Sequence, residues 1–520
     1  MSREVCRAAA IALTGLTGTT VMVEAAVSQQ LPGMAIIGLP DTALAEAKLR
    51  VRTATAHVGM PTSDRFVTIN LAPASLPKHG SGFDLAIALS ALAASGRMPA
   101  KHLGEVVHLG ELALDGALRR PAGLLSSAIA ARSLGFRRAM VPEICAPEAS
   151  LVPGLEIVPV RDLTDAVEWY RAGASSRRAG GAPVLHGRQE LSGASSPGDD
   201  LDMADVIGQQ EAVEAFAVAA AGRHHISLTG PPGAGKTLLA TRLPSILPDL
   251  TDAESLEASS IASLGGSPLT ALVRRPPFES PHHTASAVSI IGGGAGSEVR
   301  PGAITRACHG ILFLDEAPEY GRAVLDALRQ PLESGVVEIH RSRVRATLPA
   351  RVQLVLASNP CPCGNAGSPD TAAECRCTPS VRSRYLQRIS GPLSDRIDLR
   401  LVLRRVPRAL LGADGGDPTS SRELRARVEQ ARARAAERLR GTPWKVNAEV
   451  PGSWMRDRGM RLPREDTAVL DRALDLGSLT MRGYDRVLRL AWSIADLGGR
   501  DRPGRSELAR ALVLRGGGTA

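Results

Sequence analysis

Short apolar runs bounded by turn residues alternate with longer apolar or amphipathic segments over the first 171 residues. Runs flanked by Gly and Pro predict strands, and longer segments that follow a polar cap predict helices. The predicted strands are 21–27, 34–39 and 66–71, the predicted helices are 42–58 and 83–94, and segments 105–114, 122–133 and 138–141 continue the alternation. The pattern predicts a compact α/β domain over residues 1–171, which is an ordinary size for one core.

The composition changes after residue 171. Gly, Ala, Ser and Pro dominate as far as residue 200, so we expect a flexible linker over 172–203. A second α/β block is predicted over 204–405, and amphipathic helices are predicted within 406–520. The helices predicted in this last part are 422–440, 466–476, 482–497 and 505–514.

The overall composition is that of a soluble globular protein. Of the 520 residues, 44% are hydrophobic and 22% are charged. The longest uncharged apolar stretch, 85–96, has 12 residues, whereas a membrane-spanning helix needs about 20. The first residues do not form the charged and apolar regions of a signal peptide, and we expect a cytoplasmic protein that does not enter a membrane.

The positive charge comes almost entirely from arginine. Lys and Arg together number 62, of which only five are lysine, and the net charge is +9. Codon bias is one explanation of the arginine excess, and the charge still favours a polyanionic partner. Aromatic residues make up 3% of the chain, too few for a base-stacking platform, so any bound nucleic acid is expected to be tracked along its backbone.

One glycine-rich segment fits the phosphate-binding loop pattern G-x-x-x-x-G-K-[ST]. It consists of Gly230, Pro231, Pro232, Gly233, Ala234, Gly235, Lys236 and Thr237. Such a loop wraps backbone amides around the phosphates, while the lysine reaches the outer phosphates and the hydroxyl binds Mg²⁺. A short apolar run precedes the loop and a helical pattern follows it, which is the context that ATP binding requires, whereas an incidental Gly/Pro turn is the alternative.

A second motif is the apolar run 311–314 followed by two acids. Asp315 is placed to hold Mg²⁺ and Glu316 to polarise an attacking water. Adjacent acids on a strand point in opposite directions, so only the end of a strand lets both approach one site. Alone, the run is also compatible with an ordinary strand end, but together with the loop at 230–237 it predicts an ATPase.

These motifs and their surroundings resemble the AAA+ ATPases of the magnesium-chelatase-like ComM/YifB group. The resemblance rests on 205–209, LFLDEAPEY at 312–320, SNPCPCG at 358–364 and SGPLSDRID at 390–398, and it extends over nearly the whole chain. It implies a P-loop AAA+ parallel-sheet domain, a C-terminal helical lid and a ring, which the family pattern makes a hexamer. It assigns Gly208 and Gln209 to the nucleotide site.

The same resemblance assigns three further roles. Asn359 corresponds to the sensor-1 residue that orients the hydrolytic water, and Arg396 to the finger that reaches a neighbour's site. Arg482 corresponds to sensor 2, with Arg486 as the competing choice. An arginine acting in trans stabilises charge on the transferred phosphoryl group and makes hydrolysis depend on assembly.

Four of the seven cysteines lie within 17 residues: Cys361, Cys363, Cys375 and Cys377. Clustered thiols in a cytoplasmic chain favour a structural Zn²⁺ over disulfides, although C-x-C is tighter than the usual ligand spacing. Reduced thiols that stabilise a loop and a redox switch remain the alternatives. The isolated Cys6, Cys145 and Cys308 are expected to be small buried side chains.

The segment 336–348 alternates apolar and polar residues around a basic centre, which predicts a hairpin. In the related AAA+ clade such a hairpin projects into the channel of the ring. The residues expected to contact a DNA backbone are His340, Arg341, Arg343 and Arg345. A solvated hairpin is the alternative, and the glycine-rich insertion 287–300 is expected to be a flexible loop tip.

The first domain resembles the Lon-protease-like (S5-like) fold that precedes the ATPase in this family, on the residues 78–85, 107–112 and 121–124. Lon-type proteolysis needs a serine activated by a lysine. The serine position falls at Gly82, and no lysine lies between Lys101 and Lys236. Ser81 and Lys78 lie in a glycine loop without fixed geometry, so we expect a non-proteolytic domain that contributes ring contacts or DNA binding.

The leading hypothesis is therefore an ATP- and Mg²⁺-dependent ring motor on DNA. The resemblance implies branch migration in recombination and natural transformation. A chelatase-type ATPase that remodels a protein partner would share every ATP residue and is the alternative. An inactive scaffold, the third hypothesis, is disfavoured by the intact loop and acidic pair.

Overall fold

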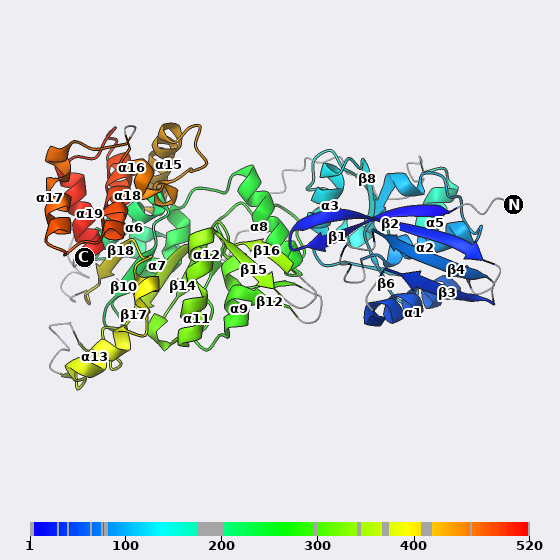
Figure 1. Ribbon diagram of the computed structural model, residues 1–520, viewed down its shortest axis with the longest axis horizontal. Helices are drawn as coiled ribbons and strands as arrows, with labels where there is room; N and C mark the ends of the chain where they lie inside the picture. The colour runs from blue at the N-terminus through cyan, green and yellow to red at the C-terminus, as the bar shows by residue number, and fades with distance from the viewer. Residues whose placement is uncertain are drawn as a thin grey trace.

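The computed structural model is elongated, with the N-terminal sheet at one end and the C-terminal helices at the other (Figure 1). It describes residues 5–28, 31–38, 41–62, 65–73, 76, 78, 82–174, 201–294, 299–340, 345–366, 374–406, 419–457 and 460–517. Most of the linker predicted over 172–203 lies outside these residues. Among the described residues, no helix is both long enough and apolar enough to cross a membrane.

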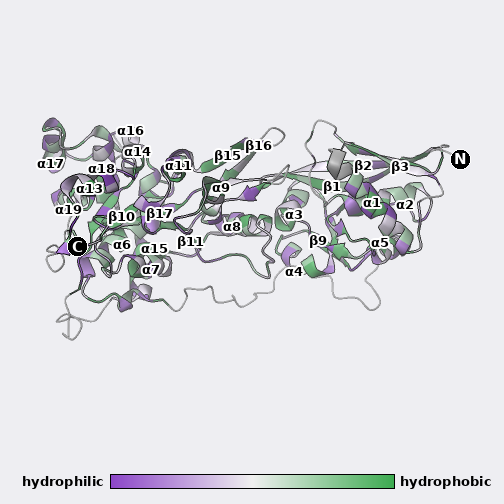
Figure 2. Cartoon of the chain, turned by 90° about the horizontal axis from the view of Figure 1, so that it is seen from below, coloured by the Kyte–Doolittle hydropathy of each residue, from purple (hydrophilic) through white to green (hydrophobic). Residues whose placement is uncertain are grey.

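The N-terminal part is built on a seven-stranded mixed sheet with the strand order β3-β4-β2-β1-β5-β8-β9. Its strands are β1 (Cys6–Thr14), β2 (Thr17–Ser28), β3 (Gly33–Ile37), β4 (Phe66–Ala72), β5 (Val106–His108), β8 (Arg138–Pro142) and β9 (Glu156–Val160), and β6 (Glu111–Leu112) pairs with β7 (Leu118–Arg119) beside it. Within the seven-stranded sheet, as far as the structure describes it, the β1–β2 and β2–β4 pairs are antiparallel and the others are parallel. Hydrophobic residues concentrate on the strands (Figure 2), as expected for a sheet covered by helices.

Five helices accompany this sheet: α1 (Asp41–His57), α2 (Asp84–Ala94), α3 (Leu124–Ser133), α4 (Ala146–Ala149) and α5 (Leu163–Arg171). The helix predicted at 83–94 is confirmed as α2, and ten of its eleven residues are buried. The strand β1 was not predicted, because its alanine-rich sequence CRAAAIALT has weak strand propensity. It is fixed instead by pairing along its whole length with β2, from Cys6 opposite Ala25 to Thr14 opposite Thr17.

The second part contains a five-stranded, all-parallel sheet with the order β11-β14-β17-β10-β18. Its strands are β10 (Ile226–Thr229), β11 (Phe278–Glu279), β14 (Ile311–Leu314), β17 (Gln353–Ser358) and β18 (Leu399–Val402). Because all five run the same way, their carboxyl ends meet at one edge of the sheet. β17 lies between β10 and β14, so the residue after β17 is placed between the predicted phosphate-binding loop and the acidic pair.

Shorter elements complete this part. The helices are α6 (Gln210–Gly222), α7 (Lys236–Ile246), α8 (Asp252–Leu264), α9 (Ala287–Ile291), α10 (Ala303–Arg306), α11 (Arg322–Ala327), α12 (Arg329–Ser334), α13 (Pro379–Leu386) and α14 (Gly391–Ser394). The predicted hairpin is confirmed as β15 (Val336–His340) paired with β16 (Arg345–Pro349). The insertion 287–300 contains α9 and pairs β12 (Gly292–Gly293) with β13 (Arg300–Pro301), and its tip at 295–298, where we expected flexibility, lies outside the described residues.

The C-terminal part is helical: α15 (Ser421–Arg438), α16 (Gly452–Met455), α17 (Arg464–Asp475), α18 (Met481–Leu497) and α19 (Arg505–Gly516). α18 carries more buried apolar residues than any other helix of this part, and most of them share one hydrophobic core with α6 and β10. An ion pair between Arg438 and the buried Asp496 (2.7 Å) joins α15 to α18. The C-terminal helices therefore pack against α6 and the parallel sheet through a shared core.

The two sheets are joined by direct contacts as well as by the chain. The backbone N–H of Leu125 on α3 donates to the Ser263 hydroxyl of α8 (3.1 Å). Arg120 donates to the carbonyls of Gly266 and Ser267, both at 2.7 Å. The turn of the β1–β2 hairpin reaches the second part too, since Leu16 packs against the apolar cluster beside β15 and β16.

Candidate nucleotide site

The loop at 230–237 turns the chain from β10 into α7. Gly233 and Gly235 have φ angles of 78° and 80°, in the left-handed region that side chains other than glycine rarely adopt. Helix α7 begins at Lys236, immediately after Gly235. The free amides of the first helical turn therefore face the space above the loop, where the positive end of the helix favours an anion.

Lys236 connects the loop to a residue from another motif. Its ammonium group donates to the carbonyls of Gly230 (2.7 Å) and Pro231 (3.0 Å) and to Oδ1 of Asn359 (3.0 Å). Burial lowers the pKa of Lys236, and the charges of Asp315 and Glu316 oppose this shift. Asn359 follows β17, so the strand order brings it beside the loop although 123 positions separate it from the lysine.

The two predicted Mg²⁺ ligands also meet. The Thr237 hydroxyl donates to Oδ2 of Asp315 over 2.8 Å, which joins the start of α7 to the end of β14. Hydroxyl and carboxylate oxygens are the donor atoms that Mg²⁺ prefers, so the pair fits this ion. These two groups would hold the ion, which would neutralise charge on a bound phosphate.

Glu316 points to a different partner from Asp315. Its backbone has a φ of 50°, in the left-handed region, which turns the chain sharply after the strand. Its Oε2 lies 3.3 Å from Nδ1 of His283. His283 is a site residue that the sequence reasoning missed. It lies in a loop without periodicity, and only the tertiary structure brings it to the acidic pair.

Gln209 contacts the backbone of the phosphate-binding loop. Its side-chain amide donates to the carbonyls of Ala234 (2.8 Å) and Arg404 (3.3 Å), and the residue is 8% exposed. Gly208 before it has a φ of 72°. Another side chain not anticipated from the sequence, Arg405, donates to the carbonyl of Pro232 (3.0 Å). The structure thus places Gln209 against the loop backbone.

The three candidate arginines occupy different places. Arg396 forms an ion pair with Glu333 and donates to the Pro392 carbonyl, 2.8 Å away. Arg486 forms an ion pair with the buried Asp398. Burial raises the pKa of Asp398, but Arg486 and His224 outweigh it and hold the pKa below its ordinary value. Arg482 is exposed at the start of α18, and no described residue forms an ion pair with it.

The four clustered thiols converge after Asn359. The Sγ distances are 3.3 Å for Cys361–Cys363, 3.8 Å for Cys361–Cys375 and 3.5 Å for Cys363–Cys375, and all four sulfurs, with Cys377, lie within 4.8 Å of one another. Tetrahedral Zn²⁺ with bonds of about 2.3 Å needs sulfurs about 3.8 Å apart. The Asn365 amide lowers the pKa of the Cys363 thiol to about 6, which favours the metal-binding thiolate. The donor set therefore fits zinc.

The basic hairpin is anchored at its base. Val337, Ile339, Ala346 and Leu348 are buried, whereas the side chains between them are exposed. His340 faces Arg345 across the pair and lies 3.4 Å from Glu338. Arg341 and Arg343, which the sequence also assigned to DNA, lie outside the described residues.

Lys78, the lysine of the Lon-like loop, is buried at 1% exposure. Its ammonium group donates to the carbonyls of Pro73 and Leu76. Burial lowers the pKa of Lys78. Ser81, its partner in the possible dyad, lies outside the described residues. The bonds of Lys78 are those of a lysine that holds a loop.

The chain matches three family descriptions in succession. Residues 23–144 match "Subunit ChlI of Mg-chelatase", residues 202–411 match "Magnesium chelatase, subunit ChlI", and residues 418–515 match its C-terminal part. The loop, the acidic pair, Asn359 and the cysteine cluster all fall within the second match.

Full-length relatives agree. The chain is 44% identical over 511 residues to the uncharacterized protein Rv2897c of Mycobacterium tuberculosis, covering 98% of both chains. It is 38% identical over 502 residues to competence protein ComM of Haemophilus influenzae, covering 96% of this chain and 95% of that one. It is 39% identical over 505 residues to the uncharacterized protein YifB of Escherichia coli, covering 97% and 96%. The chain belongs to the ComM/YifB family of magnesium-chelatase-like AAA+ ATPases.

Proposed function

We propose that this protein is the subunit of a homo-oligomeric ring, a hexamer, that hydrolyses ATP to move along DNA and to drive branch migration in recombination and natural transformation. The observation that carries the ATPase part is the convergence of Lys236, Thr237, Asp315 and Asn359 at one edge of the parallel sheet. The similarity to a protein named for competence supports the DNA part.

Each residue at this edge has a proposed task. Lys236 and the loop amides bind the outer phosphates of ATP, and Thr237 with Asp315 would hold Mg²⁺, which would neutralise charge on those phosphates. Glu316 accepts a proton from the attacking water, while Asn359 orients that water. His283 lies 3.3 Å from Glu316 and is proposed to position its carboxylate.

Assembly is proposed to complete the site. Arg396 lies three residues before β18, and the neighbouring Asp398 donates its backbone N–H to the His225 carbonyl just before β10. Arg396 is therefore at the amino edge of the sheet, opposite its own phosphate-binding loop, and serves a neighbour's site instead. Arg486 is held by Asp398 at the same amino edge, which favours Arg482 as sensor 2.

DNA contact is proposed for the hairpin β15–β16, through His340, Arg341, Arg343 and Arg345. The net charge of +9 supports a phosphate-bearing partner, and the shortage of aromatic residues supports backbone contacts over base reading. A cytoplasmic location, where such DNA is found, is part of the same proposal.

A chelatase-type ATPase that remodels a protein partner is the second candidate. The family descriptions that match all three parts of the chain favour it. Both candidates share the ATP site, so only the partner distinguishes them.

Forked DNA is expected to raise ATP turnover about 5-fold or more, the lower end of ordinary coupling between two sites. We also expect a gel shift with forked DNA in the presence of a slowly hydrolysed ATP analogue, weakening steeply as salt rises. Turnover and mobility that do not respond to forked, branched or linear DNA would favour the second candidate. An unrelated polyanion, heparin, controls for bulk charge.

A structural zinc is proposed for Cys361, Cys363, Cys375 and Cys377. The purified protein is expected to contain about one zinc per chain, measured by plasma mass spectrometry. Cys361→Ala should lower this to near zero, because Cys361 is fully buried among the other thiols. Cys145→Ala, which removes a buried thiol from the N-terminal part, is the control and should retain the metal. A wild-type chain purified without zinc, or equal zinc in both variants, would contradict the assignment.

A further inference from the structure

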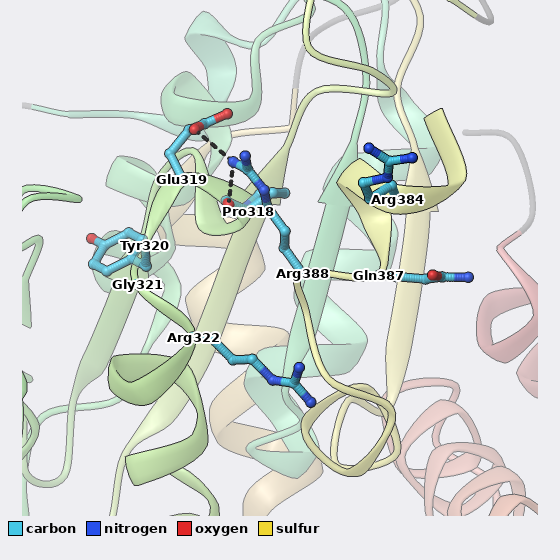
Figure 3. A pocket seen from close by; sticks show the side chains of 8 residues that line it. All are labelled: Pro318, Glu319, Tyr320, Gly321, Arg322, Arg384, Gln387 and Arg388. Atoms are coloured by element: carbon cyan, nitrogen blue, oxygen red, sulfur yellow. Dashed lines mark hydrogen bonds and ion pairs between the residues drawn. The ribbon is translucent and has the colours of Figure 1, made fainter. Parts of the chain in front are cut away.

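A cavity of about 550 Å³ lies beside the ATP site, between the segment that follows the acidic pair and helix α13 (Figure 3). Its lining contains three guanidinium groups. Arg384 and Arg388 come from α13 and the residues after it, and Arg322 comes from the start of α11. The one carboxylate in the lining is Glu319. Two elements far apart in the sequence therefore present an excess of positive charge to one space.

The existing ion pairs leave this charge incompletely neutralised. Arg388 donates to Glu319 (2.9 Å) and to the Pro318 carbonyl (3.2 Å). Arg322 lies 3.6 Å from Asp326, and its side chain is 84% exposed. Arg384 is exposed and has no acidic partner among the described residues. Exposed ion pairs of this kind are screened by solvent and contribute little to stability. The guanidinium groups are therefore available to bind an anion.

Helix α13 is held firmly enough to fix these groups. Tyr385 is 4% exposed and anchors the helix to the body of the protein. Arg382, one turn before Tyr385 on the same helix, donates to the Cys377 carbonyl (3.0 Å) and contacts the Cys375 sulfur (3.3 Å). The cysteine cluster and the buried tyrosine thus position the arginines, which lowers the entropy lost when a ligand binds.

We propose that this cavity binds a phosphate of a nucleic-acid backbone, as a contact separate from the hairpin β15–β16. The inference rests on the proposed action on DNA. Guanidinium groups match phosphate geometry. Tyr320, the one aromatic residue in the lining, is buried at 3% exposure with its hydroxyl bonded to the Pro281 carbonyl, so no ring is offered to a base. The cavity therefore recognises the backbone and neither a base nor a nucleoside.

The cavity also has a direct route to the catalytic glutamate. The backbone N–H of Glu319 donates to the Glu316 carbonyl over 2.7 Å. A phosphate that takes Arg388 from Glu319 leaves an unpaired carboxylate one short turn from Glu316. DNA held here is thereby linked to the group that activates water.

The test compares the double variant Arg322→Ala/Arg384→Ala with a control of equal charge, Arg52→Ala/Arg472→Ala, whose two side chains are exposed on α1 and α17. Affinity for labelled forked DNA is measured by fluorescence anisotropy at several salt concentrations with a slowly hydrolysed ATP analogue. The cavity variant should bind about 10-fold more weakly than the control at ~0.1 M salt, and its salt slope should be smaller by about 1 to 2. Thermal unfolding and oligomer size verify folding, and the single variant Arg384→Glu replaces the double variant if that one fails to fold.

The outcomes separate this inference from the proposed function. A wild-type protein that does not bind DNA contradicts the proposed function itself. If the wild type binds DNA and the cavity and control variants bind it with equal affinity, only the proposal that the cavity binds a DNA phosphate is overturned. In a third outcome, the cavity variant keeps its DNA affinity but loses ATP turnover in the absence of DNA. The cavity would then bind a phosphate of a neighbouring subunit's nucleotide, which also overturns the inference.

Discussion

Replacement of Lys236 by alanine is expected to lower ATP turnover at least ~100-fold, equivalent to about 2.7 kcal/mol of transition-state stabilisation. Lys236 is 9% exposed, and its ammonium group lies within 3.0 Å of Asn359 and of two loop carbonyls. No other lysine occurs between Lys101 and Lys445, so none nearby in sequence could replace it. The loss should appear as absent phosphate release at saturating ATP, with or without DNA.

Lys445→Ala is the matched control, because Lys445 is exposed in the C-terminal part. Its turnover should stay within about 2-fold of the wild type, as expected for a surface substitution. Lys236→Ala that retained more than a tenth of the wild-type turnover would show that this loop does not bind the outer phosphates.

The nucleotide motifs were predictable because their chemistry is local. A loop that must wrap backbone amides around phosphate needs glycine at Gly233 and Gly235, and the structure gives both residues positive φ angles. The acidic pair was predictable because the apolar run before it indicates a buried strand once the phosphate-binding loop is also present, and β14 is buried at all four positions.

Contacts made by tertiary structure carried no such signal. His283 reaches Glu316 only because the loop before α9 crosses the end of β14, and nothing in its neighbourhood marks it. Among 57 arginines, the sequence could not single out Arg384 or Arg388, since their shared cavity is formed by segments more than 50 positions apart. β1 was missed for a related reason, because its partner β2 supplies the stability that its alanines lack.

Arg396→Ala is expected to lower turnover at least ~100-fold in the assembled protein while leaving ATP bound, since a trans arginine acts on the charge of the transition state. Arg396 lies at the amino edge of the sheet. It lines an open surface pocket of about 520 Å³ together with Arg329 and Glu333. The phosphate-binding loop lies beyond the carboxyl end of β10, four strand residues or about 13 Å away from that edge. This separation supports the proposal that Arg396 acts on the nucleotide of a neighbouring subunit.

Mixing two inactive variants tests this directly. Lys236→Ala subunits keep Arg396, and Arg396→Ala subunits keep an intact phosphate-binding loop. In a mixed ring, some interfaces therefore place the Arg396 of one variant beside the intact loop of the other. Turnover should reappear in the mixture and should depend on the ratio of the two proteins. Arg322→Ala in place of Arg396→Ala distinguishes a finger from an arginine that only contacts DNA, because its mixture with Lys236→Ala should gain nothing beyond the turnover of its own subunits. If the Arg396→Ala mixture stayed inactive at every ratio while the rings exchanged subunits, Arg396 would act within its own chain, and a site completed by an adjacent subunit would be excluded.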